Sequence, residues 1–222
     1  MILCVETTSL NCSVALCNES GRIDLLEHRE KGYTHAEKLH VFIDEILKRN
    51  QITSKDLQAI AVSMGPGSYT GLRIGVSSVK GLCYALNIPL MAISTLEMLL
   101  SAVAVEEVYS QIIPMIDARR MEVYMQVFSN ERAAKTEVEA NILDATYFEN
   151  LPSNTLVLGE GADKFKSLLP TSVKLQEGVF PSASMMVQLA LSKFQKKQFE
   201  DVAYFEPFYL KEFIAGTPKA IK

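Results

Sequence analysis

The stretch from Ala59 to Ile93 constrains the fold of this chain more than any other part of the sequence. It reads as an apolar strand, a Gly-Pro-Gly loop, a helix rich in small residues and a second apolar strand. The helix keeps Gly71, Gly75 and Gly81, although each glycine destabilises a helix by about 1 kcal/mol relative to alanine. We therefore expect another segment to approach this helix closely.

The surrounding sequence predicts an α/β fold with mixed sheets flanked by helices. In the first 105 residues we expect two or three antiparallel strands, then alternating helices and strands, at 2–6, 12–17, 23–28, 34–49, 59–64, 68–86 and 90–93. Thr34 with Glu37 has the spacing of a capping box, and Ser94 with Glu97 indicates a further helix to about residue 105.

Residues 106–222 are expected to form a second unit, whose last segment could pack back on the first. Its predicted strands lie at 111–116, 121–129 and 156–158, and an amphipathic helix is predicted at 184–194. The sequence contains no repeat that relates the two units.

The composition is that of an ordinary globular protein, because 48% of the residues are hydrophobic and 22% are charged. A net charge of −4 and a pI of about 5.5 argue against a stand-alone nucleic-acid binder, but not against nucleic acid held mainly by a partner. The four cysteines lack CxxC spacing, so neither zinc nor a disulfide framework is indicated. Without a basic leader or an apolar run of about 18 residues, we expect a cytoplasmic protein with no membrane contact.

Two neighbouring stripes run along the glycine-rich helix. The first is apolar and should pack on the sheet: Leu72, Val76, Val79, Cys83 and Leu86. The second is small and mostly smooth: Gly71, Gly75, Ser78, Leu82 and Ala85. The second stripe is either a docking face for a helix of another chain or a close contact inside this chain, for example with helix 34–49. Spacing alone slightly favours the contact inside the chain.

Few polar residues have the arrangement of an active site. The loop Gly65, Pro66, Gly67 and Ser68 joins a strand to a helix, where backbone N–H groups can hold a phosphate, but it matches no established phosphate motif. Glu6 ends the first strand and precedes three hydroxyl residues, yet one acid without a second is weak evidence for catalysis. A tight turn is the simpler interpretation of both segments.

The remaining polar candidates are interpreted as surface residues. His35 and His40 lie about 140° apart around their predicted helix, so they cannot share a metal ion, and we interpret them as solvated. Asp117, Arg119 and Arg120 lie in a charged turn that is typical of salt-bridged surface.

The chain resembles the bacterial tRNA threonylcarbamoyladenosine biosynthesis family TsaB in three segments, ILCVETTSLNCSVAL, MGPGSYTGLRIGVSSVKGL and IDARRMEVY. The resemblance runs from Ile2 to about Leu210. It implies the two-lobed actin/hexokinase/Hsp70-like (ASKHA) fold with a reduced second lobe. It also implies a non-catalytic subunit that binds the catalytic paralogue TsaD, with the ATPase TsaE joining the pair. TsaD transfers threonylcarbamoyl from threonylcarbamoyl-adenylate to the adenosine next to the anticodon in tRNAs reading ANN codons.

The resemblance also assigns roles to residues. Thr95 and Leu99 stand where the paralogue has histidine metal ligands, and Glu6 replaces the usual aspartate, so no metal site and no catalytic residue is expected. Any nucleotide contact would be weak and would involve Glu6, Gly65, Gly67 and Ser68. The family dimerises through the helices at 34–49 and 68–86, which favours the docking interpretation of the small stripe. The expected partner contacts are His35, Leu39, Phe42, Gly71, Gly75, Ser78, Leu82 and Ala85.

Two function classes therefore remain. A scaffold subunit would bind TsaD, form a homodimer when alone and meet tRNA only through the complex; Gly75→Leu should then abolish binding while the monomer stays folded. The alternative is a small-molecule phosphotransferase of the same superfold, which needs a metal-binding acid pair that this sequence does not offer.

Overall fold

The first lobe is built on a five-stranded mixed sheet with the order β3-β2-β1-β4-β5. The computed structural model describes residues 1–21, 23–30 and 34–211. The strands are β1 (Ile2–Glu6), β2 (Asn11–Cys17), β3 (Ile23–Arg29), β4 (Ala59–Gly65) and β5 (Leu90–Ser94). Strand β1 is antiparallel to β2 and parallel to β4, and both β1 and β2 are buried along their whole length. A strand buried on both faces needs helices on both sides of its sheet.

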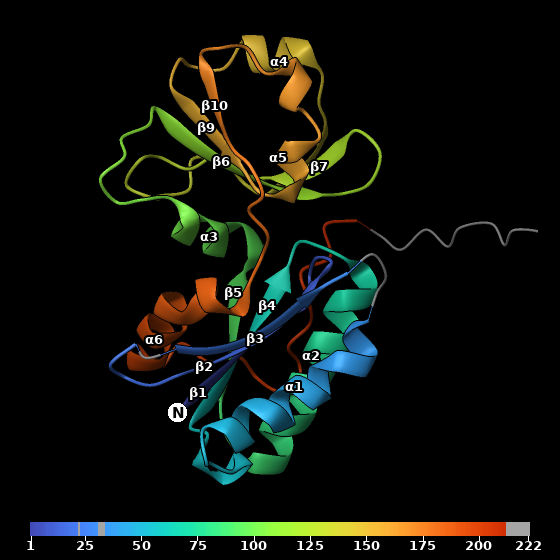
Figure 1. Cartoon of the computed structure of the whole chain (residues 1–222), viewed down its shortest axis with the longest axis vertical. Helices are drawn as coiled ribbons and strands as arrows, with labels where there is room; N and C mark the ends of the chain where they lie inside the picture. The colour runs from blue at the N-terminus through green and yellow to red at the C-terminus, as the bar shows by residue number, and fades with distance from the viewer. Residues whose placement is uncertain (22, 31–33, 212–222) are drawn as a thin grey trace, which may run out of the picture.

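Helices cover both faces of this sheet (Figure 1). Helices α1 (His35–Arg49) and α2 (Tyr69–Leu86) lie on one face, where Leu39, Ile43 and Val76 pack against the strands. The other face is covered by α6 (Val187–Gln195) and the short 3-10 helix η4 (Ala183–Met186), which come from the far end of the chain. A further 3-10 turn, η1 (Ser54–Asp56), precedes β4.

The second lobe repeats the topology of the first in a shorter form. Its strands are β6 (Gln111–Asp117), β7 (Glu122–Met125), β8 (Glu139–Ile142), β9 (Thr155–Leu158) and β10 (Val173–Gln176), in the order β10-β9-β6-β7-β8. Strand β6 is antiparallel to β7 and parallel to β9, as β1 is to β2 and β4. The helical segments are short here: α4 (Ala145–Glu149), α5 (Glu160–Asp163) and η3 (Lys166–Leu168). The lobes are therefore two versions of one unit, although the sequence shows no repeat.

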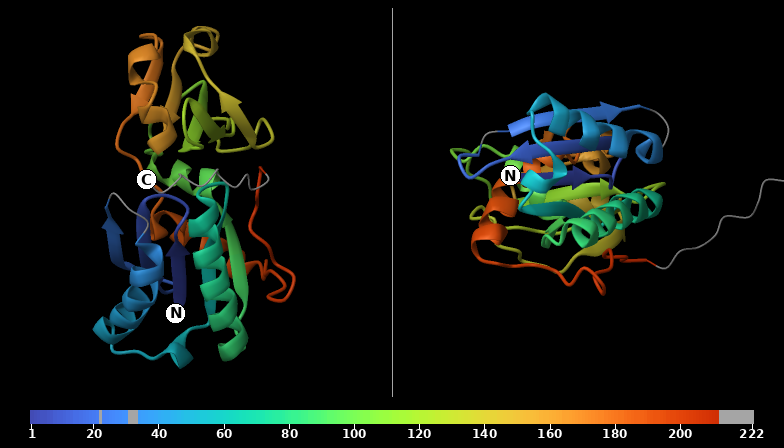
Figure 2. Two further views of the ribbon diagram at one scale, coloured as in Figure 1. Left: turned by 90° about the vertical axis from the view of Figure 1, so that its right-hand side faces the viewer. Right: turned by 90° about the horizontal axis from the view of Figure 1, so that it is seen from below.

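Two connections join the lobes (Figure 2). The first is α3 (Thr95–Leu99) with η2 (Leu100–Ala102), whose Leu96 and Leu99 pack into the core of the second lobe. The second is the chain after β10, which returns to the first lobe through α6. Beyond α6, Glu200 forms an isolated antiparallel β-bridge with Leu90 at the edge of the sheet, and Phe205 is buried in the core that α2 also lines.

Several local predictions need correction. Thr34 precedes α1 but forms no capping box, because its ψ of 7° lies outside the extended region from which a threonine hydroxyl reaches the helix N–H groups. The helix after Ser94 ends at Ala102 rather than near 105, and β7 ends at Met125 rather than 129. No helix in the described part of the chain combines the length and apolar character that a membrane span requires.

Candidate partner surface and interlobe site

The turn after β1 is held by the buried Glu6 carboxylate. This side chain has no exposed surface, and its Oε1 accepts hydrogen bonds from the backbone N–H and the hydroxyl of Thr8. Burial raises the pKa of Glu6 to about 7, and the hydrogen bonds from Thr8 oppose this rise. Glu6 therefore organises its own turn and does not face solvent.

The Gly-Pro-Gly loop closes against the same turn. The Ser68 N–H donates to the Thr8 carbonyl at 2.7 Å, and a Cβ on Gly67 would lie 2.5 Å from Thr8 Cβ. Ser68 also caps α2, since its hydroxyl accepts from the Gly71 N–H at 3.2 Å. A phosphate at this loop would have to displace the Thr8 carbonyl from the Ser68 N–H. Gly67 and Ser68, two of the residues expected to contact a nucleotide, instead contact Thr8 of the same chain.

The glycines of α2 allow the first turn of the sheet to approach the helix. The Thr7 hydroxyl donates to the Gly71 carbonyl at 2.8 Å. A Cβ on Gly71 would collide with the Thr7 carbonyl, and one on Gly75 with the Thr7 hydroxyl. A leucine at Gly75 would have to displace Thr7, so Gly75→Leu is expected to destabilise the monomer as well as any interface. The close contact predicted from the glycines is real, but it is made by Thr7, which the sequence marked only as one of three hydroxyl residues after Glu6.

Half of the eight expected partner contacts are buried within the monomer. His35 and Leu39 are fully buried, and His35 Nε2 lies 2.7 Å from the Ser9 carbonyl oxygen. His35 is thus not a solvated histidine, because the start of α1 packs on the turn after β1. Ser78 Oγ lies 3.1 Å from His40 Nε2 and so links α2 to α1. Spacing could not show that Gly71 and Gly75 of this stripe contact Thr7, whereas Ser78 contacts α1.

The outer face of the α1–α2 pair is more exposed and partly apolar. Phe42 and Leu82 are half-buried and Ala85 is exposed, so these three expected contacts stay predictions. The sequence analysis missed two larger apolar side chains on the same helices, Val41 at 55% and Tyr84 at 84% exposed. We define the outer helix face as Val41, Gly81, Tyr84 and Ala85, while Phe42 and Leu82 pack partly against the core. A Cβ on Gly81 would meet no atom within 4 Å.

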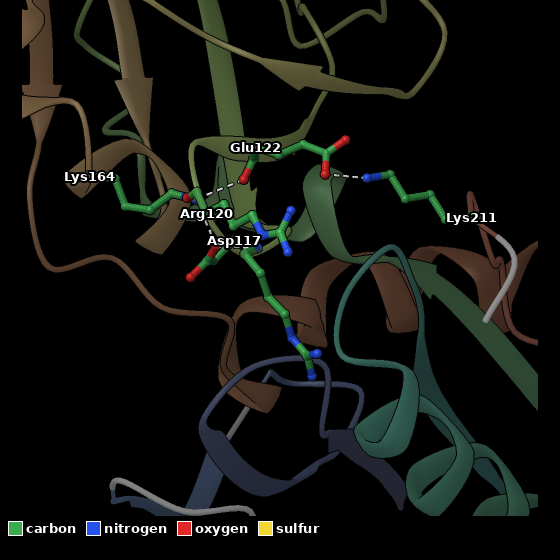
Figure 3. A network of polar contacts seen from close by, with 6 residues as sticks. Asp117, Arg120, Glu122, Lys164 and Lys211 are labelled. Carbon is green, nitrogen blue, oxygen red and sulfur yellow. Dashed lines mark hydrogen bonds and ion pairs between the residues drawn. The ribbon is translucent and has the colours of Figure 1, made fainter. Parts of the chain in front are cut away.

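The β6–β7 turn brings charged side chains to the gap between the lobes (Figure 3). The Lys164 ammonium donates to Asp117 Oδ1 at 2.7 Å and to the carbonyls of Arg120 and Glu122 at 2.8 and 2.7 Å. The Arg119 N–H donates to Asp117 Oδ1 at 2.7 Å. The turn is thus salt-bridged through Asp117, as predicted, but its arginine side chains form no ion pair among the residues that the structure describes.

A second acid, Glu160, lies near this turn at the start of α5. Burial first, and then the charges of Asp117, Glu6 and Asp163, raise its pKa to about 7. Thr95 and Leu99, which the resemblance aligns with the paralogue's ligands, are both fully buried in α3. Across residues 1–21, 23–30 and 34–211, no three histidine, cysteine or acidic side chains gather closely enough to hold a metal ion.

Comparison with solved structures defines the class of protein. The chain superimposes on YeaZ from Pseudomonas aeruginosa with a TM-score of 0.78 and 25% sequence identity, over 94% of this chain and 99% of that one. Together with the two lobes of equal topology, this similarity identifies an ASKHA-like α/β protein.

Sequence comparison then identifies the family. A family model described as TsaD, tRNA N6-adenosine threonylcarbamoyltransferase, matches residues 29–217. The TsaB protein of Escherichia coli is 28% identical over 226 residues, covering 96% of each chain, and that of Bacillus subtilis is 30% identical over 76% of this chain and 74% of its own. This chain belongs to the TsaB proteins of tRNA threonylcarbamoyladenosine biosynthesis.

Proposed function

We propose that this chain is a non-catalytic scaffold subunit that binds TsaD and supports threonylcarbamoyl transfer to tRNA in the cytoplasm, with TsaE joining the pair. The proposal rests on one observation: the chain keeps the family fold but lacks the histidine metal ligands that the resemblance assigns to the paralogue. The chain matches TsaB relatives over most of its length, while Thr95 and Leu99, which the resemblance aligns with the paralogue's ligands, lie in a packed core. Neither side chain replaces an imidazole as a metal ligand.

The outer helix face is the surface we assign to TsaD. Val41 and Tyr84 are large apolar side chains that the monomer leaves in water, and burying them on a partner is favourable. The open position at Gly81 lets a partner helix approach the backbone of α2 closely. The same face would form a homodimer when TsaD is absent.

A phosphotransferase is the alternative function. It would require a phosphate bound at the Gly-Pro-Gly loop, where the Ser68 N–H is already engaged by Thr8. It would also require an available acid, whereas Glu6 is buried and bonded to its own turn. We therefore propose no cofactor of the chain's own. Magnesium-dependent ATP turnover by the isolated chain would favour the alternative.

The test is the mass in solution of the chain mixed with its cognate TsaD, measured by light scattering. We expect a one-to-one heterodimer for the wild type and none for Gly81→Arg, whose new side chain points into solvent in the monomer. Gln195→Arg is the matched control, because it adds the same charge to an exposed helix position on the opposite side of the sheet. Absence of the wild-type heterodimer would refute the proposed function. Normal binding by Gly81→Arg would refute only the assigned surface.

A further inference from the structure

Residues 203–211 form a strap along α2. Lys80 of α2 donates to the carbonyls of Ala203 and Phe205 at 3.2 and 2.7 Å, and the Phe208 N–H donates to the Met64 carbonyl at 2.7 Å. The strap then reaches the second lobe, where Lys211 forms an ion pair with Glu122 (Figure 3). The strap therefore brings its final side chains to the place where the two lobes meet.

Aromatic side chains of the strap and of α2 gather there. The rings of Tyr209 and Tyr69 lie 4.9 Å apart between centroids, and the guanidinium of Arg73 lies 4.1 Å from the Tyr69 centroid. The two rings are tilted by 40° to each other. Tyr209 is 37% exposed and Arg73 is exposed, so this cluster reaches water mainly through these two side chains. The Lys211 ammonium lies 5.9 Å from the ring of Tyr124 in β7, which extends the cluster onto the second lobe.

Two arginines lie beside this cluster on the β6–β7 turn. Arg119 and Arg120 have φ angles of 71° and 55°, a left-handed conformation that non-glycine residues rarely adopt. Asp117 and Lys164 hold the turn through its backbone, which leaves both guanidinium groups exposed. Glu122, two residues after Arg120, forms the ion pair with Lys211, so the β6–β7 turn and the strap meet at this point.

We propose that this aromatic–basic surface, made by Tyr69, Arg73, Arg119, Arg120, Tyr209 and Lys211, contacts a single-stranded segment of the tRNA directly. Stacked bases and phosphates require exposed aromatic rings and cations at one place, and this surface supplies both. An acidic peptide would use the arginines but would not need the exposed ring of Tyr209. The inference rests on the proposed function for its RNA, and it replaces the expectation that tRNA is met only through the partner.

The charge of the whole chain limits this contact to a supporting role. With a net charge of −4, the chain gains little from long-range attraction to RNA, so most of the affinity comes from TsaD. The surface instead contributes short-range stacking and a few phosphate contacts. These contributions predict a moderate loss of affinity on mutation and a reduced dependence on salt.

The experiment measures binding of a fluorescein-labelled, unmodified transcript of a tRNA reading ANN codons. Fluorescence anisotropy is recorded with the isolated chain at low salt and with the chain–TsaD complex over a salt series. The variants are Tyr209→Ala and the pair Arg119→Ala with Arg120→Ala. Tyr209→Phe keeps the stacking ring. The control pair Lys55→Ala and Lys196→Ala removes two exposed cations elsewhere.

We expect Tyr209→Ala and the arginine pair each to weaken binding by the complex about tenfold, within the range for one stacked base. The arginine pair should also reduce the slope of log affinity against log salt by about 1.5. Tyr209→Phe and the lysine control should bind as the wild type does. Unchanged affinity and slope in both test variants would overturn the inference while leaving the heterodimer intact.

Light scattering on the same samples separates the two proposals. If no heterodimer forms, the proposed function fails, and the isolated chain decides the inference. RNA binding that the Tyr209→Ala and arginine variants weaken would then support the surface. Absent binding, or binding that all variants share, would overturn it.

Discussion

Replacing Gly71 by alanine should destabilise the protein, whereas the same change at Gly81 should stabilise it. Both residues lie in α2, so alanine improves the helix propensity of each by about 1 kcal/mol. At Gly71 the new Cβ would lie well within 3.0 Å of the Thr7 carbonyl oxygen, a separation that real Cβ atoms essentially never show. The turn or the helix must move, and Thr7 then loses its hydrogen bond to the Gly71 carbonyl.

The magnitude follows from these contributions. Overpacking costs about 1–3 kcal/mol, and a lost hydrogen bond about 1 kcal/mol, which the helix propensity offsets. The net loss for Gly71→Ala is about 2 kcal/mol. At Gly81 nothing lies within 4 Å of the added methyl group, so the gain of about 1 kcal/mol remains. For a chain of this size these values correspond to a Tm lowered by about 4–8 °C and raised by about 2–4 °C, respectively.

Thermal and urea unfolding, followed by circular dichroism at equal protein concentration, measures the difference. Because the two variants have the same composition and lie in the same helix, any effect of propensity cancels between them. A Gly71→Ala variant as stable as Gly81→Ala would refute the assignment of this glycine to the contact with Thr7.

Three further predictions concern single side chains. Burial raises the pKa of Glu6 from 4.5 to about 7, so the protonated acid favours the folded state at low pH, and this contribution of about 3 kcal/mol is lost as pH rises from 4.5 to 7. In urea titrations Glu6→Gln should therefore gain stability relative to the wild type over this interval. A stability difference between the two proteins that does not change with pH would contradict the assignment. Lys164→Met should remove the three hydrogen bonds that Lys164 donates to the β6–β7 turn and speed amide hydrogen exchange at residues 118–122 at least tenfold. Unchanged exchange would show that Lys164 does not stabilise the turn. Ser68→Ala should cost about 1 kcal/mol by removing the cap of α2, whereas Thr34→Ala should cost less because Thr34 caps nothing; equal losses in chemical unfolding would contradict this difference.

Strong local patterns made the first lobe predictable. The apolar runs at β1, β4 and β5 are long enough to be recognised, and the glycine-rich helix has one clear apolar stripe. In the second lobe β8 has no buried residue, so hydrophobic pattern could not reveal it. Strand β10 does alternate, with Val173 and Leu175 against Lys174 and Gln176, but four residues give too short a signal.

The candidate site was less predictable because its contacts join distant segments. Glycine spacing correctly indicated a close approach to α2, but it could not say that Thr7 would make that approach. The strap meets α2 and β7 only after the chain has passed through the whole second lobe, so Tyr209 and Tyr69 become neighbours through the fold alone. Sequence patterns report local periodicity, whereas these contacts depend on how the lobes are assembled.

The central claim is that this TsaB protein does no chemistry itself but enables TsaD to modify tRNA. The most direct measurement is threonylcarbamoyladenosine formed on an unmodified tRNA transcript supplied with threonylcarbamoyl-adenylate, TsaD and TsaE, with and without this chain. We predict product only when TsaD and this chain are both present, and none with this chain alone. Equal product without the chain, or product formed by the chain in the absence of TsaD, would contradict the claim.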